Sequence, residues 1–263
     1  MRRRRSGDGD ARRAAQLSEP VLLIGGLGQG AWAWQWVEPL LAEEQDVRVL
    51  VPRGTGALRD VPPRRSVVEM AADAAAELSG PTHVVGLSMG GYISLTLALE
   101  HPELVRSLVL IGTGPGGPNR VPRPQHIREA YEAAVALGPG EYERTTQRLS
   151  LAPGWPEANP DRYEEIIAAR MADVSTLDVM WAHLEACYEY YDAGIPIERI
   201  EARALVLHGT EDVVVPPENG RMLAARLPNA EYVEIVGGGH NLPLEIPDEV
   251  AQRIDSWVRL ASE

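Results

Sequence analysis

Residues 83–91 read HVVGLSMGG, and this stretch decides the fold. His83–Val85 is a short apolar run typical of a buried strand, and residues 92–99 continue as a helix. Between them, residues 86–90 (GLSMG) match the pattern G-x-S-x-G, which places a serine on a sharp turn from strand to helix. Glycine is needed at both ends of the pattern because a side chain there would collide with the neighbouring strand or helix. The sequence therefore predicts that the hydroxyl of Ser88 projects from the end of a sheet.

Further apolar runs alternate with helical stretches along the chain. They are continuous and rich in Val, Ile and Leu, as expected of strands buried on both faces. The predicted strands are Val21–Ile24, Val47–Val51, His83–Val85, Ser107–Ile111, Ala204–Leu207 and Tyr232–Val236. Ser66–Leu78 has apolar residues at helical spacing, and Pro247 begins a final amphipathic helix. This alternation predicts an α/β fold with a mostly parallel central sheet and helices on both faces.

One region interrupts the alternation. Residues 119–196 contain helical patterns and no convincing strand, which indicates a helical lid inserted over the carboxyl ends of the strands. We therefore expect a core formed by residues 20–118 and 197–263. Residues 1–19 carry an arginine cluster and are expected to be a flexible basic tail.

A serine hydroxyl is a weak nucleophile near neutral pH and needs a base. His240, in the segment GGGHN after the last strand, is the histidine expected on a flexible loop at the strand ends, where it could reach Ser88. The segment HGTED after the strand Ala204–Leu207 offers an acid to orient that base. We favour Asp212 over its neighbour Glu211 for this role.

These segments resemble the α/β-hydrolase superfamily across about residues 20–260. Further stretches are similar to small, lid-bearing bacterial members, which include esterases, lactonases and cofactor-free haloperoxidases. They are Trp34, HPELVRSLVL at 101–110, HGTEDVVVP at 208–216 and LPNA at 227–230. The resemblance implies a triad of Ser88, Asp212 and His240, in the chain order of that fold. It also implies an oxyanion hole made by the backbone N–H groups of Met89 and Leu27.

The sequence departs from the family pattern at two places. The family usually carries His-Gly after its first core strand, but this chain has Gly25-Gly26. A common Asp-x-Arg-Gly phrase is here Val51-Pro52-Arg53-Gly54. Because of the first difference, the histidine side chain that would brace the oxyanion loop carrying Leu27 is absent.

The reaction expected from the triad is cleavage of an ester or lactone through an acyl-enzyme. Large apolar residues of the lid, Trp155, Trp181 and Tyr188, are expected to line a pocket for an apolar, small to medium-sized substrate. The alternative is that they pack the lid on the core. The same triad could serve C–C bond hydrolysis, perhydrolysis or a lyase or cyclase step, and the fold also occurs in non-catalytic binding proteins.

Two other ligand classes are disfavoured. Residues 26–31 fit the dinucleotide pattern G-x-G-x-x-A, but the next strand ends in Val51-Pro52-Arg53 without an acid for a ribose. His208 and Asp212 could suggest a metal pair, but no clustered third ligand is apparent. We therefore expect neither cofactor nor metal.

The composition of the chain argues against some classes of binding partner. The formal charge is −13, and because the first thirteen residues carry about +4, the body is near −17, which disfavours nucleic acid. No apolar run is long enough to cross a membrane. Cys187 is the single cysteine, and the arginines near the start lack a signal-peptide pattern, so we expect a cytoplasmic protein acting on a small molecule. The absence of Lys and Phe suggests the codon bias of a high-GC genome.

Overall fold

A six-stranded parallel sheet forms the centre of the molecule. The computed structural model describes residues 18–138 and 140–262, so most of the predicted basic tail (residues 1–19) lies outside the described residues. The strands run in the order β2-β1-β3-β4-β5-β6, and each neighbouring pair is parallel. Their bounds are β1 Pro20–Ile24, β2 Asp46–Leu50, β3 Thr82–Leu87, β4 Val105–Ile111, β5 Arg203–Gly209 and β6 Ala230–Ile235. Each predicted strand is present, shifted by a few residues at most, and the predicted fold class is confirmed.

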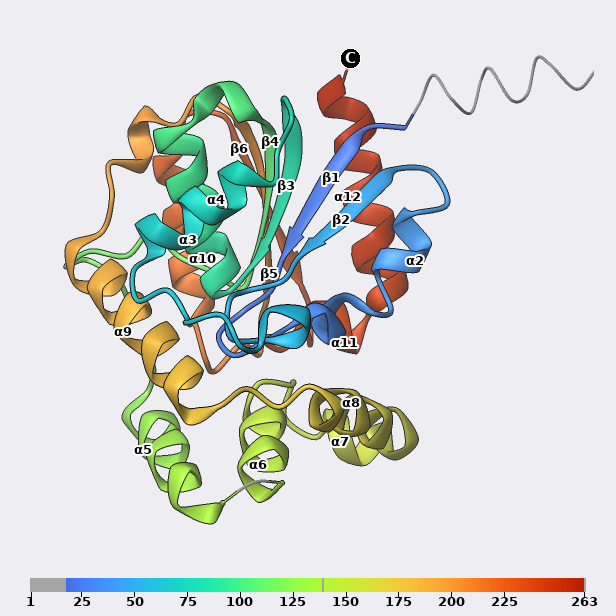
Figure 1. The fold of residues 1–263 in the computed structure, drawn as a ribbon, viewed down its shortest axis with the longest axis vertical. Coiled ribbons are helices and arrows are strands. Elements are labelled where there is room, and N and C mark those ends of the chain that lie inside the picture. Colours follow the sequence, from blue (N-terminus) through green and yellow to red (C-terminus); the bar gives the residue numbers. More distant parts are fainter. Residues whose placement is uncertain (1–17, 139, 263) are drawn as a thin grey trace, which may run out of the picture.

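Helices cover both faces of this sheet (Figure 1). On one face lie α3 (Val67–Ala76), α4 (Met89–Glu100) and α10 (Pro217–Arg226). On the other lie α2 (Glu38–Leu41) and α12 (Pro247–Ser262). Two clusters of buried apolar side chains fill the spaces between the layers. The central strands β3 and β4 are therefore buried on both faces, which is why their sequences are continuous apolar runs.

Capping residues fix the ends of several helices where the sequence predicts them. Ser66 precedes α3, and its hydroxyl accepts the N–H of Glu69 at 3.2 Å. Pro247 occupies the first position of α12. Short one-turn elements complete the core: α11 (Leu242–Glu245) and the 3₁₀ helices η1 (Ala31–Trp34), η2 (Gly56–Leu58), η3 (Pro102–Leu104) and η5 (Ile197–Arg199).

The segment from 119 to 196, between β4 and β5, is helical in its described part. Its elements are α5 (Gln125–Ala134), η4 (Val135–Leu137), α6 (Glu141–Leu149), α7 (Trp155–Ala158), α8 (Pro160–Ala172) and α9 (Leu177–Ala193). We call this segment the helical block. Figure 1 shows α5 to α8 grouped beyond one end of the sheet, with α9 leading back along its side. The block thus stands over the edge where the strands end. Within the described residues no helix is long and apolar enough to cross a membrane.

Candidate active site

Ser88 sits on a strained turn between β3 and α4. Its φ angle is 54°, and it is the one non-glycine residue with positive φ in the described part of the chain. Its backbone N–H donates to Ile111 O at 2.9 Å, and its carbonyl accepts the Thr113 hydroxyl at 2.9 Å. A Cβ at Gly86 would overlap the backbone carbonyl of Gly90, so the turn requires glycine there. Contacts with the end of β4 therefore hold Ser88 in a conformation that an isolated turn would avoid.

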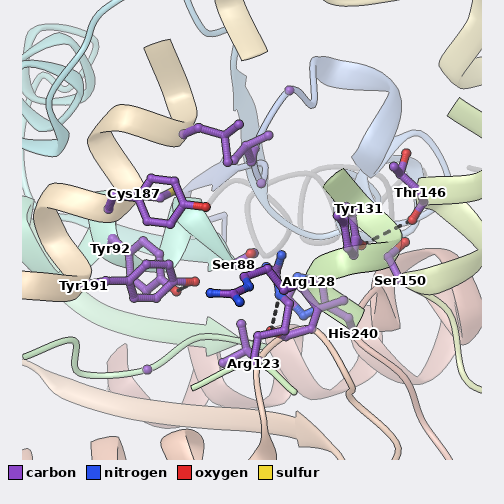
Figure 2. A pocket seen from close by; sticks show the side chains of 18 of the residues that line it. Ser88, Tyr92, Arg123, Arg128, Tyr131, Thr146, Ser150, Cys187, Tyr191 and His240 are labelled. Atoms are coloured by element: carbon purple, nitrogen blue, oxygen red, sulfur yellow. Dashed lines mark hydrogen bonds between the residues drawn. The ribbon is translucent and has the colours of Figure 1, made fainter. Parts of the chain in front are cut away.

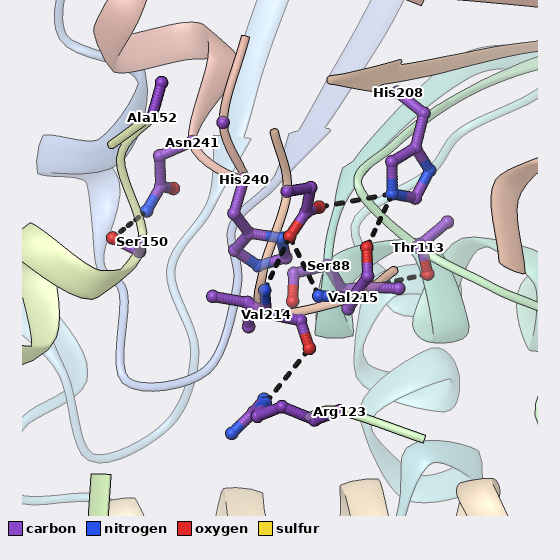
Figure 3. Close-up of polar contacts among 12 residues, drawn as sticks. Ser88, Thr113, Arg123, Ser150, Ala152, His208, Val214, Val215, His240 and Asn241 are labelled. Atoms are coloured by element: carbon purple, nitrogen blue, oxygen red, sulfur yellow. Dashed lines mark hydrogen bonds and ion pairs between the residues drawn. The ribbon is translucent and has the colours of Figure 1, made fainter. Parts of the chain in front are cut away.

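Asp212 and His240 are hydrogen-bonded to each other beside this turn (Figure 3). His240 Nδ1 lies 2.8 Å from Asp212 Oδ2, and because a carboxylate only accepts, Nδ1 carries the proton. His240 Nε2 is thereby left as the lone-pair nitrogen. Ser88 and His240 line one cavity, without a hydrogen bond between the Ser88 hydroxyl and the ring. The neighbouring Glu211 is exposed, whereas Asp212 is buried.

The buried Asp212 carboxylate accepts several hydrogen bonds. Its Oδ1 takes the backbone N–H groups of Val214 and Val215, each at 2.8 Å. His208 Nε2 lies 3.2 Å from Oδ2 and 2.9 Å from Val215 O, so this nitrogen is protonated and shared between two acceptors. Burial raises the pKa of Asp212, but electrostatic attraction to His240 and the hydrogen bonds from both histidines outweigh it and hold that pKa well below its usual range. The acid is thus ionised and fixed in place.

His208 has no metal-binding neighbourhood in the described residues, where no group of three His, Cys, Asp or Glu side chains lies together. Its role is local. The ring is fully buried at the end of β5 and orients Asp212 through the Nε2 hydrogen bond. The sequence reveals only that His208 and Asp212 are four residues apart.

Gln29 connects the loop after β1 to the loop that carries His240. Its side-chain oxygen accepts the Gly26 N–H at 2.7 Å, and its side-chain nitrogen donates to Asn241 Oδ1 at 3.1 Å. Asn241 in turn donates to the Ser150 hydroxyl of the helical block at 2.7 Å. This buried chain braces the segment in which the family's histidine is replaced by Gly25. Sequence reasoning missed Gln29 because its partner Asn241 is 212 positions away.

The loop after β1 lies directly against the serine. A Cβ at Gly26 would be 3.4 Å from Ser88 Cβ, and the next residue, Leu27, lines the cavity. The predicted Met89 begins α4 immediately after the turn and is fully buried. The N–H of Gly28 donates to His183 Nδ1 on α9 at 3.1 Å, and burial lowers the pKa of His183 to about 4, which keeps this ring neutral.

The cavity has a volume of about 480 Å³ and is walled by both the sheet end and the helical block (Figure 2). Of the three predicted pocket residues, Trp181 and Tyr188 line it, and both are about half exposed. Trp155 does not line it but packs against the core cluster, so that expectation was wrong. An apolar side chain on a helical block can meet either the cavity or the core, and the sequence does not distinguish these.

The cavity wall is more polar than expected. Tyr92, Tyr131, Tyr142 and Tyr191 contribute phenol groups, and Tyr92 donates to Tyr191 at 2.8 Å. Four arginines also line it: Arg120, Arg123, Arg128 and Arg170. The expected apolar lining is therefore only part of the wall.

Comparison with known proteins agrees with the fold. The model of the "Alpha/beta hydrolase family" matches residues 21–253, and the chain belongs to this family. It is an enzyme, a hydrolase. A relative named "Putative carbamate hydrolase RutD", from Caulobacter vibrioides, is 30% identical over 250 residues, covering 91% of this chain and 90% of that protein.

Two solved structures are similar over nearly their whole length. A "Putative non-heme bromoperoxidase BpoC" from Mycobacterium tuberculosis has a TM-score of 0.78 at 26% identity, covering 93% of each chain. A thermophilic esterase from Thermogutta terrifontis has a TM-score of 0.75 at 26% identity, covering 94% of this chain and 91% of that one. These relatives come from bacteria and carry different chemistries in their names.

Proposed function

We propose that this hydrolase cleaves an ester or lactone through an acyl-enzyme on Ser88. The observation that carries the proposal is the Nδ1 hydrogen bond from His240 to Asp212, which leaves Nε2 as the base in the cavity that holds Ser88. The esterase from Thermogutta terrifontis, similar over 94% of this chain, supports the same reaction class.

The steps follow from these positions. His240 Nε2 removes the Ser88 proton as Oγ attacks the carbonyl carbon, and Asp212 stabilises the resulting imidazolium. The N–H groups of Met89 and Leu27 are proposed to stabilise the oxyanion. The imidazolium then protonates the leaving alcohol as the C–O bond breaks. His240 then removes a proton from water as the water attacks the acyl-enzyme, and it gives this proton to Ser88 Oγ as the Oγ–acyl bond breaks, which releases the acid and restores Ser88 and neutral His240.

The helical block is proposed to act as a lid that selects the substrate. Its helices contribute Trp181 and Tyr188, together with tyrosines and arginines, to the wall opposite the sheet end. A carbamate is the second candidate substrate because of the relative named as a carbamate hydrolase, and its carbonyl could be attacked by the same serine. Purified protein assayed against matched ester, lactone and carbamate substrates would rank these classes.

The first test of the mechanism is covalent labelling with a fluorophosphonate probe, read by mass spectrometry. We expect labelling at Ser88, none in Ser88→Ala, and undiminished labelling in Ser79→Ala, which removes an exposed serine elsewhere. Replacing Ser88 should lower kcat by several orders of magnitude. Ester turnover that survives in Ser88→Ala would refute the acyl-enzyme.

A further inference from the structure

The active-site cavity gathers positive charge in an acidic protein. The chain carries 38 acidic and 25 basic residues, yet four arginines and a single carboxylate, Glu132, line the cavity. The arginines come from the segment before α5 (Arg120, Arg123), from α5 (Arg128) and from α8 (Arg170). A cationic wall in a cavity focuses the electrostatic potential toward anions, whatever the net charge of the surface.

Two of these arginines have carboxylate partners. Arg120 lies 3.4 Å from Asp192, whose side chain is largely exposed, and also donates to Tyr191 O at 3.0 Å. Arg128 lies 3.7 Å from Glu132. Both ion pairs are long or solvent-exposed, so they neutralise the two guanidinium groups only in part.

Arg123 has no carboxylate within 4 Å among the described residues. Its Nε donates to Val214 O at 3.0 Å, and its guanidinium carbon lies 4.8 Å from the centroid of the Tyr131 ring. Val214 also donates its N–H to the Asp212 carboxylate. Figure 3 shows Arg123 below Val214, close to Ser88 and His240. This guanidinium is thus anchored through Nε, and its terminal nitrogens have no hydrogen-bond acceptor among the described residues of the cavity that Ser88 and His240 also line.

Arg170 is the second arginine without a carboxylate within 4 Å in the described part of the chain. Its Nη1 donates to Glu143 O at 3.0 Å and lies 3.4 Å from Gln147 Oε1, and its guanidinium carbon is 5.9 Å from the Tyr142 ring centroid. Burial lowers the pKa of Arg170 from its usual range. The direct contacts of this partly buried cation are neutral oxygens and rings, and the Glu143 carboxylate, which acts to raise its pKa, lies beyond 4 Å, so a bound anion would supply the closer negative charge.

We propose that Arg123 and Arg170 form a binding site for an oxyanionic substituent of the substrate, a carboxylate or a phosphate. A planar guanidinium can donate two parallel hydrogen bonds to two oxygens of such a group, and each of these is a charge-assisted hydrogen bond. The scissile carbonyl then lies at Ser88 while the anion faces the helical block. This substrate class rests on the proposed function, and it differs from the apolar substrate expected from the sequence.

Matched substrates test the proposal. On the acyl side, the 4-nitrophenyl monoester of adipic acid is compared with 4-nitrophenyl hexanoate. On the alcohol side, 4-acetoxybenzoate is compared with its methyl ester, and 4-acetoxyphenyl phosphate separates phosphate from carboxylate. We expect kcat/KM for one of the anionic substrates to exceed that of its neutral counterpart by at least about 10-fold, the size of one charge-assisted contact.

Variants then assign the preference to residues. Arg170→Met should lower the anionic-to-neutral ratio of kcat/KM by about 10-fold, and Arg170→Lys should restore part of that ratio. Arg144→Met is the matched control, because Arg144 is an exposed arginine of α6 that pairs with Glu164 outside the cavity. Arg123→Met should lower the same anionic-to-neutral ratio. If the contact of Arg123 with Val214 is needed for turnover of every substrate, Arg123→Met is inactive, and the ratio measured for Arg170→Met decides the test.

A direct binding measurement tests the anion site independently of catalysis. Calorimetry on the Ser88→Ala protein compares 4-acetoxybenzoate with its methyl ester and needs no turnover. Tighter binding of the anion that is lost in Ser88→Ala/Arg170→Met supports the site, even if no ester is cleaved. Equal or weaker binding of the anions, or a ratio unchanged in both arginine variants, would overturn the site while labelled Ser88 left the proposed function standing.

Discussion

Replacing Gln29 by Met should weaken both the fold and the reaction. Met has nearly the same length but can neither accept the Gly26 N–H nor donate to Asn241. Gly26 is buried, so its N–H would lose its acceptor without gaining water. A buried donor left unsatisfied costs about 1–3 kcal/mol. At about 2–4 °C per kcal/mol for a domain of this size, Tm should fall by roughly 2–12 °C.

The effect on turnover follows from the position of the loop. A Cβ at Gly26 would be 3.4 Å from Ser88 Cβ, so the loop lies against the serine, and the adjacent Leu27 is the proposed oxyanion donor. Loss of one oxyanion donor raises the activation free energy by about 2.7–4 kcal/mol. Because Gln29→Met would displace the loop without removing its N–H group, this value is the upper limit of the effect. We therefore expect kcat for a nitrophenyl ester to fall by about 10-fold or more, up to that limit, with a smaller change in KM.

Gln29→Glu serves as the matched variant. A glutamate keeps an oxygen to accept the Gly26 N–H but cannot donate to Asn241, so it should retain more activity than Gln29→Met. The assays are ester kinetics and thermal unfolding of the three proteins at one pH. Wild-type kcat and Tm in Gln29→Met would refute the bracing role, and equal losses in both variants would show that the bond to Asn241, not to Gly26, is the important one.

Further predictions concern the acid, a buried carboxyl and the serine turn. Asp212→Asn should lower kcat by about 10⁴-fold because the amide favours the wrong His240 tautomer, whereas Glu211→Gln should be near wild type; the reverse result in steady-state kinetics would contradict the assignment. Burial raises the pKa of Glu245 to about 7, so its stabilising contribution is complete below about pH 4.5 and is lost as the pH rises through 7. Urea unfolding at pH 5 and pH 8 should therefore show a larger loss of stability for wild type than for Glu245→Gln, and parallel losses would disprove it. Gly86→Ala should lower the free energy of unfolding by about 1–3 kcal/mol through overlap with the next turn, while Gly80→Ala, which has open space, should not; calorimetric Tm values would decide.

The fold was predictable because its signals are local. Runs such as residues 108–111 are apolar throughout, which suits strands covered on both faces, and the observed β4 contains that run. Pro247 predicts the start of the final helix, and α12 begins at that residue. The serine turn combines a strand, two glycines that neighbouring backbone approaches closely, and a helix within one short segment. Adjacent residues are therefore enough to predict its geometry.

The parts that escaped prediction depend on contacts between distant segments. Trp155 and Trp181 are both apolar members of the helical block, but one packs on the core and the other borders the cavity. Arg170 looks like a solvent-exposed charge in sequence, because a helix pattern does not reveal whether its polar face meets water or a cavity. Gln29 belongs to no recognisable sequence motif, because its side-chain hydrogen bonds form only where three loops meet in the folded chain.

Because Ser88 has a positive φ, the residue that would be most stable at this position differs from the residue that catalysis needs. Glycine would occupy this turn without steric strain, so Ser88→Gly should relax the backbone while removing the attacking oxygen. Selection of random variants for heat resistance alone would then tend to discard the serine, whereas selection for turnover would retain it. A library screened both ways would therefore diverge at residue 88, and the divergence would identify the nucleophile by the strain of its backbone.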